Sequence, residues 1–76
     1  MSASKYKVVL VYDEAEKVYN VSVPSLPGCF TFGASRAEAL EKVTEAIEGY
    51  LEVLLEDGDP IPSGNAELAE VAVIYG

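Results

Sequence analysis

A long amphipathic pattern that begins at Ser35 constrains the fold of this chain more than any other feature of its sequence. Ser35 and Glu38 have the spacing of a capping box, which marks the start of a helix. Apolar residues then recur every three to four positions until Gly58 and Pro60 interrupt the pattern. We therefore expect one helix over about residues 36–57 that buries one stripe against another layer. The apolar stripe consists of Leu40, Val43, Ile47, Tyr50, Leu51 and Leu54.

The segments before this helix predict that the other layer is a sheet. Residues 6–12 are rich in valine and aromatic side chains, and residues 18–23 alternate apolar with polar side chains, so both are predicted strands. The polar turn DEAEK joins them as a hairpin. Residues 29–33 alternate again, with Phe30 and Phe32 on one face, and add a third strand. We expect a meander of three strands with the helix packed on one face.

The end of the sequence predicts a fourth strand. Residues 58–67 contain two prolines and two glycines and are expected to form an irregular connection. Residues 68–75 then alternate as a strand does. The predicted order is βββαβ, an α+β fold in a single domain over residues 1–76, because a chain of this length supports one small core. Such a sheet has edges that a second copy could pair with, so we expect self-association.

The outer face of the predicted helix is acidic. The chain has thirteen acidic residues, five basic ones and no histidine, for a formal net charge of −8. This charge repels phosphate backbones and disfavours direct nucleic-acid binding, whereas it favours a basic protein partner. On a helical wheel six glutamates fall within roughly 80° of one another, although a face that only keeps the protein in solution explains them too. Our candidate partner-binding residues are Glu41, Glu45, Glu48 and Glu52.

Residue types suited to catalysis are present but do not form a known constellation. Cys29 is the one cysteine, and without a histidine it has no base that would activate it as a nucleophile. We expect it to fill space beside a Pro-Gly turn. Asp13 and the helix glutamates could be read as the Mg²⁺ site of a nuclease, but aspartate at this position is also a common turn residue. We predict no enzyme activity, no metal site and no cofactor.

The cellular location is predicted from what the sequence lacks. No segment is apolar over the length that crosses a bilayer, and the first residues lack the apolar core of a signal peptide. A single cysteine cannot form an internal disulfide. We expect a reduced, cytoplasmic protein.

Three motifs follow one another along the chain: the turn P-x-L-P-G-C, the helix core E-A-L-x-x-x-x-E-A-I and the closing D-G-x-P-I-P. Each is weak alone, but in this order and spacing they resemble the HicB family of antitoxins from type II toxin–antitoxin systems. The resemblance covers about residues 5–62. The turn positions that match, to which we assign a structural role, are Pro24, Leu26, Pro27, Gly28 and Cys29.

The resemblance implies a fold, a function and partners. The fold looks like a reduced ribonuclease H fold that lacks the catalytic acids. The function implied is that of an antitoxin, which binds a small basic toxin of the HicA type and occludes the histidine that cleaves mRNA. Family members commonly form dimers or tetramers, and many carry a C-terminal DNA-binding domain, which we do not expect in a chain that stops at Gly76. The alternatives are an orphan oligomeric binding module with no toxin and, less favoured, a Mg²⁺-dependent nuclease.

Overall fold

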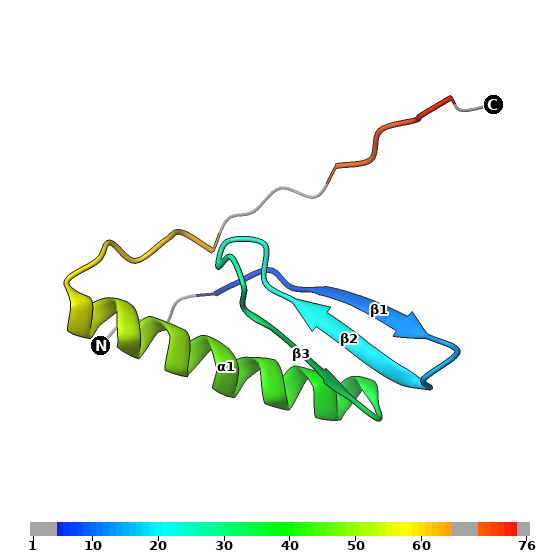
Figure 1. Cartoon of the computed structure of the whole chain (residues 1–76), viewed down its shortest axis with the longest axis horizontal. Coiled ribbons are helices and arrows are strands. Elements are labelled where there is room, and N and C mark those ends of the chain that lie inside the picture. The colour runs from blue at the N-terminus through cyan, green and yellow to red at the C-terminus, as the bar shows by residue number, and fades with distance from the viewer. Residues whose placement is uncertain (1–4, 65–68, 75–76) are drawn as a thin grey trace.

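Three strands and one long helix make up the regular structure of the residues that the structure describes (Figure 1). The structure is a computed structural model and describes residues 5–64 and 69–74. The strands are β1 (Val9–Asp13), β2 (Val18–Ser22) and β3 (Phe30–Gly33), and the helix is α1 (Arg36–Asp57). The predicted α+β class is confirmed, and so are the three strands and the bounds of the helix.

The three strands form an antiparallel sheet in the order β1-β2-β3. In the β1–β2 hairpin, Leu10 lies opposite Val21 and Val11 lies opposite Asn20. In the second pair, Val21 lies opposite Thr31 and Asn20 lies opposite Phe32. Because residues opposite each other point to the same face, this register assigns every strand residue to one of two faces. The predicted meander is therefore correct, although β1 begins three residues later than predicted, at Val9.

The connection between β2 and β3 is a double turn that buries its own leucine. The backbone N–H of Leu26 donates to the carbonyl of Val23, and the N–H of Cys29 donates to the carbonyl of Leu26, both at 3.0 Å. Gly28 has φ of 82°, as the third position of a type II turn requires, and Pro27 supplies the fixed φ of the position before it. The predicted Pro-Gly turn is confirmed, and it places the Leu26 side chain in the core with no exposed surface.

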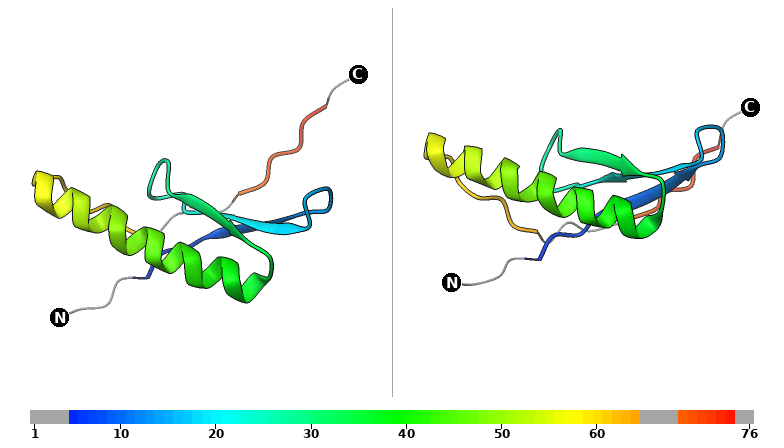
Figure 2. Two further views of the ribbon diagram at one scale, coloured as in Figure 1. Left: turned by 60° about the horizontal axis from the view of Figure 1, so that its bottom comes forward. Right: turned by 90° about the horizontal axis from the view of Figure 1, so that it is seen from below.

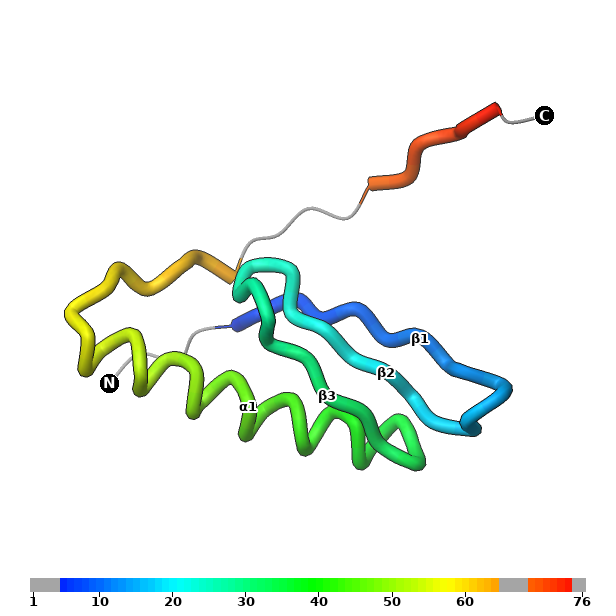
Figure 3. The backbone as a smooth tube through the Cα atoms, in the orientation of Figure 1, coloured from blue at the N-terminus to red at the C-terminus, as the bar shows by residue number. Residues whose placement is uncertain are grey.

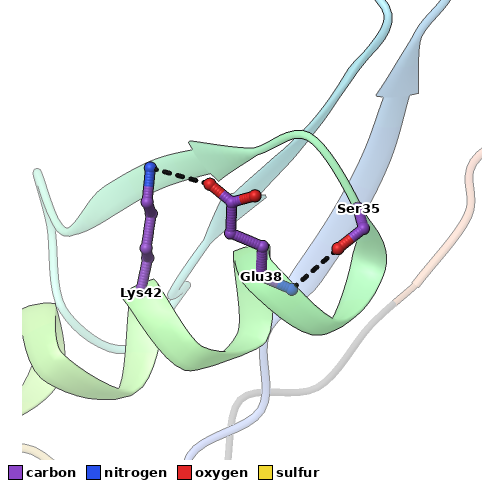
Figure 4. A network of polar contacts seen from close by, with 3 residues as sticks. All are labelled: Ser35, Glu38 and Lys42. Carbon is purple, nitrogen blue, oxygen red and sulfur yellow. Dashed lines mark hydrogen bonds and ion pairs between the residues drawn. The ribbon is translucent and has the colours of Figure 1, made fainter.

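Both ends of α1 are capped by backbone and side-chain hydrogen bonds. The Ser35 hydroxyl accepts from the N–H of Glu38 at 3.1 Å, while the Glu38 carboxylate binds Lys42 at 3.1 Å (Figure 4). The predicted capping box is thus half formed, since Glu38 reaches forward along the helix. At the other end Gly58 has φ of 72°, and its N–H and that of Asp59 donate to the last helical carbonyls, which is a Schellman ending.

The helix covers one face of the sheet, and no other helix or strand of the described residues covers the opposite face (Figure 2). The core lies between the two layers, and half-buried residues such as Leu10, Ile47 and Leu51 surround it. The layers meet most closely where a Cβ added to Gly33 would lie 2.5 Å from the backbone nitrogen of Ala39. Glycine at this position therefore lets the first turn of α1 approach β3. The buried core residues are Val21, Val23, Leu26, Cys29, Ala39 and Val43.

The predicted fourth strand is not formed within the described residues. After α1 the chain returns to the start of the sheet, where the Tyr6 hydroxyl donates to the carbonyl of Pro62 at 2.8 Å (Figure 3). Residues 69–74 are exposed and belong to no strand, while residues 65–68 and 75 of the prediction lie outside the described residues. Residues 69–74 have the alternation typical of a strand, but a strand forms only where a second strand pairs with its backbone. None of the three described strands pairs with this segment.

Candidate functional site

The four candidate glutamates lie together on the outer side of α1. Glu41, Glu45, Glu48 and Glu52 are all exposed, whereas the residues of the opposite side of the helix are buried or half-buried. The helix holds them rigidly in one row because it is capped at both ends and packed along its length. We call this row, with these four members, the acidic stripe. Whether a partner binds to it is not tested by the geometry and stays a prediction.

The acidic stripe has little internal charge compensation. Within residues 5–64 and 69–74 the only ion pair is the one between Lys42 and Glu38, next to the stripe at the start of α1. Glu41 and Glu45, like Glu48 and Glu52, are four residues apart on the helix surface, where like charges destabilise a helix by about 0.2–0.5 kcal/mol per pair. The stripe therefore presents a negative surface that costs the isolated helix some stability, and a cationic partner would relieve that cost.

The residues of the family turn contribute to the core and not to an exposed site. Leu26 and Cys29 are buried, and the Tyr50 hydroxyl of α1 donates to the carbonyl of Pro27 at 2.9 Å, so the turn is fastened to the helix. Cys29 is a free thiol, and burial raises its pKa. The reactive thiolate is therefore disfavoured at neutral pH. The structure places Cys29 as a small packing residue, as its position beside the Pro-Gly turn predicts.

Asp13 has a structural role in the β1–β2 turn. Its carboxylate Oδ1 accepts hydrogen bonds from the backbone N–H groups of Ala15 at 2.9 Å and Glu16 at 3.1 Å. These bonds shape the turn in the way expected of an aspartate at its first position. Among the residues that the structure describes, no three histidine, cysteine, aspartate or glutamate side chains are grouped as metal ligands would be. Asp13 and the acidic stripe are thus not brought together.

The structure exposes one surface that the sequence analysis did not identify as a site. The face of the sheet turned away from α1 carries Val11, Phe30 and Phe32, all exposed, and beside them the polar residues Asn20 and Ser22. The sequence carried part of the signal, because alternation places Phe30 and Phe32 on one face. The pairing of Ser22 with Phe30, which turns that face away from α1, is seen only in the register of the strands. We call this surface the open sheet face. Its members are Val9, Val11, Val18, Asn20, Ser22, Phe30 and Phe32.

Two apolar residues near the end of α1 are also exposed. Val53 and Leu55 lie on the outer sides of the helix, and Val53 lines a shallow depression together with Tyr50 and Leu54. In the part of the chain that is described, no helix is long and apolar enough to cross a membrane. Leu55 stands close to the acidic stripe, so any partner of the stripe would also meet an apolar side chain.

Comparison with known proteins places this arrangement in a family. A UPF0150 protein of Thermoplasma acidophilum is 48% identical over 63 residues, which cover 83% of this chain and 90% of that protein. A UPF0150 protein of Archaeoglobus fulgidus is 51% identical over 57 residues, covering 72% of this chain and 81% of the relative. A UPF0150 protein of Synechocystis is 32% identical over 66 residues, covering 87% and 84%. No solved structure gives a significant match.

The family itself is identified by a match that spans nearly the whole described chain. The model of the family described as HicB-like antitoxin of bacterial toxin–antitoxin systems matches residues 6–73. The match includes all three strands, the buried turn, α1 and most of the segment that follows it. The resemblance inferred from the turn and helix motifs is therefore confirmed: this chain belongs to the HicB-like antitoxin family.

Proposed function

We propose that this chain is the toxin-binding module of a toxin–antitoxin pair and that it neutralises a small, basic, mRNA-cleaving toxin of the HicA type. The observation that carries the proposal is the acidic stripe, in which four exposed glutamates lie in one row on a capped helix and have no basic partner among residues 5–64 and 69–74. Membership of the HicB-like antitoxin family supports a toxin as the partner class. The likeness to a reduced ribonuclease H fold stays a prediction.

The acidic stripe suits a ribonuclease partner for an electrostatic reason. A protein that binds RNA carries a positive surface that contacts phosphates, and a row of carboxylates competes for the same surface. Opposite charges also steer the two proteins together, which raises the association rate 10- to 1000-fold at low salt. Docking of α1 on the basic surface would then keep RNA away from the cleaving histidine. In this mechanism the antitoxin acts by occlusion and needs no catalytic group.

The first test is co-expression with the product of the neighbouring reading frame. We expect a basic product that arrests growth when it is expressed alone, and we expect this chain to restore growth and to co-purify with it. The control is Leu26→Ala, which removes a buried core side chain and destabilises the folded module. Restored growth with the wild type and arrest with the control support the proposal, whereas arrest with both and no complex contradict it.

The second test asks whether the acidic stripe makes the contact. The variant Glu45→Lys with Glu48→Lys reverses two charges in the stripe, and the control Glu14→Lys with Glu16→Lys makes the same change of net charge in the exposed β1–β2 turn. We expect the stripe variant to slow association about tenfold or more at low ionic strength, with a smaller difference at high salt. Equal rates for the two variants would show that net charge, and not the stripe, attracts the toxin.

A further inference from the structure

Two phenylalanine rings stand on the open sheet face at the spacing of a stacking platform. Phe30 is 72% exposed and Phe32 56%, and both belong to β3, so the strand holds their rings two positions apart on one face. Sheets that recognise RNA carry aromatic residues in the same way and stack two or three bases on them. Here the rings lie on a face that no described helix or strand covers.

The middle of the face offers hydrogen bonds beside the rings. Asn20 lies opposite Phe32 and Ser22 lies opposite Phe30, and both polar residues are exposed on β2. The amide of Asn20 and the hydroxyl of Ser22 each donate and accept hydrogen bonds. Such groups bind the edges of unstacked bases and ribose hydroxyls. A purely apolar partner would instead bury these groups without hydrogen bonds, which is unfavourable, so this column favours a planar ligand with polar edges.

Basic residues border the end of the face where β1 begins. Tyr6 and Val8 pack against the core, so Lys5 and Lys7, which alternate with them along the chain, lie on the side of the open sheet face. Both lysines are exposed. The nearest acids, Asp13 and the glutamates of the β1–β2 turn, lie at the other end of the face. One end of the face is therefore basic, although the chain as a whole is acidic.

A third lysine reaches the face across the edge of β3. The ammonium of Lys42 lies 5.5 Å from the centre of the Phe32 ring and 3.1 Å from the carboxylate of Glu38 (Figure 4). Both side chains of this ion pair are exposed, so the pair contributes little to stability and Lys42 can turn to a phosphate. The acidic stripe lies on the outer side of α1, away from the sheet. The net charge of −8 therefore overstates the repulsion that an anion meets at this face.

We propose that the open sheet face is a binding site for a short stretch of single-stranded RNA. Two successive bases stack on the rings of Phe30 and Phe32. The phosphates on either side of them contact Lys7 and Lys42, and the amide of Asn20 hydrogen-bonds to the edge of a base. This inference does not rest on the proposed function, because the open sheet face is distinct from the acidic stripe.

The size of the face suits a short single strand. Three strands about 4.8 Å apart and up to five residues long, at about 3.4 Å per residue, cover roughly 15 by 17 Å. This is about a third of the roughly 800 Å² that each partner contributes to a standard protein interface, but it is enough for the two or three bases that a sheet stacks. Each stacked base strengthens binding at least about fivefold. With so few contacts we expect a dissociation constant of about 10 µM to 1 mM.

The test is a titration of the ¹⁵N-labelled full chain, without any toxin, with the RNA pentamer UUAUU at about 50 mM salt, followed by amide chemical shifts. We expect the shifts to map to β2 and β3, and Phe30→Ala with Phe32→Ala to weaken binding at least about tenfold. The matched control is Leu55→Ala with Val53→Ala, which shortens two apolar side chains of α1 that are 67% and 55% exposed. We expect the control to bind like the wild type.

A second pair of variants tests the phosphate contacts. Lys7→Gln removes a charge at the basic end of the face, whereas Lys17→Gln removes the same charge in the β1–β2 turn, beside the acids. We expect Lys7→Gln to weaken binding about two- to threefold at low salt and less at high salt, and Lys17→Gln to have a smaller effect. A DNA pentamer of the corresponding sequence lacks the 2′-hydroxyls, so we expect it to bind several-fold more weakly.

Several results would overturn the inference. The face is not an RNA site if about 1 mM RNA causes no shifts, if the shifts map to α1, or if the phenylalanine variant binds within twofold of the wild type. Equal binding of an RNA duplex would mean that charge alone attracts RNA, and equal binding of DNA would remove the assignment to RNA. Shifts of the face that follow protein concentration, toxin or anionic vesicles while RNA has no effect would assign it to those partners. Circular dichroism of each variant shows that it is folded.

Discussion

The acidic stripe and the open sheet face lie on opposite sides of one core and differ in charge and in exposed apolar surface. The stripe is charged, repels itself and acts over a distance set by salt, whereas the open sheet face is uncharged and acts only at contact. The acidic stripe belongs to a helix whose apolar side is packed against the sheet. The open sheet face belongs to strands that α1 covers on one face only.

The difference shows how a chain of 76 residues can offer two surfaces that do not compete. A sheet with a helix on one face buries only one of its two faces, so the other is available at no further cost to the fold. Because the acidic stripe is charged and the open sheet face is not, the two surfaces suit partners of different chemistry. Substitutions in the shared core, at the junction of the layers and in the acidic stripe show how much each of them contributes to the stability of the fold.

The largest expected effect comes from the core that both surfaces share. Leu26→Ala removes a side chain with no exposed surface and leaves a cavity between the layers, so we expect the free energy of unfolding to fall by about 2–5 kcal/mol, measured by urea titration. Leu55→Ala shortens an exposed leucine of α1 and should change the stability by less than about 0.5 kcal/mol. If the two variants were equally stable, the turn would not belong to the common core.

A smaller effect is expected at the junction of the layers. Gly33→Ala puts a Cβ against the backbone of Ala39 and Glu38, at 2.5 and 2.9 Å, so α1 has to shift and we expect a loss of about 1–3 kcal/mol. Gly49→Ala is the control, because a Cβ there meets nothing within 4 Å and removes a flexible residue from the helix interior. We expect it to gain up to about 1 kcal/mol. Thermal unfolding of both variants measures the difference in stability. Equal stabilities would mean that α1 does not pack closely against β3 at Gly33.

The smallest effect isolates the acidic stripe. Glu52→Gln removes like-charge pairs with Glu48 and Glu56, so we expect a gain of about 0.4–1 kcal/mol at low salt that shrinks as salt screens the pairs. Glu38→Gln breaks the ion pair with Lys42 and should instead cost about 0.3–0.5 kcal/mol. Urea titration at two salt concentrations measures both. If both variants changed the free energy of unfolding in the same direction, repulsion between the glutamates of the stripe would not be what destabilises the helix.

Much of the fold could be predicted from the sequence because its signals are local. The spacing of Ser35 and Glu38, the apolar period of the helix and the glycine at its end determine α1 within a short stretch of chain. The Pro27-Gly28 pair determines the turn in the same way. The segment 69–74 was predicted wrongly as a strand of this chain, because alternation describes one strand and says nothing about whether a neighbour is available.

The candidate surfaces were predictable to different degrees. Exposure of the acidic stripe follows from helix geometry, but glutamates face solvent in any helix, so its function does not follow. The open sheet face was missed because of what alternation leaves open. Alternation predicts that Phe30 and Phe32 share a face, but it does not predict which face of the sheet α1 covers. That choice depends on the register that the turn imposes, which pairs Phe30 with Ser22 and Phe32 with Asn20.

The burial of Leu26 also bears on how members of this family diverge. The turn that makes the family recognisable lies in the interior, fastened to α1 through Tyr50, so selection for folding alone is enough to preserve it. Surface positions such as Glu48 and Phe30 are under no such constraint and can change independently of it. Two chains that share the turn can therefore have unrelated partners, and inheritance of a partner is better judged from the outer side of α1 and the open sheet face.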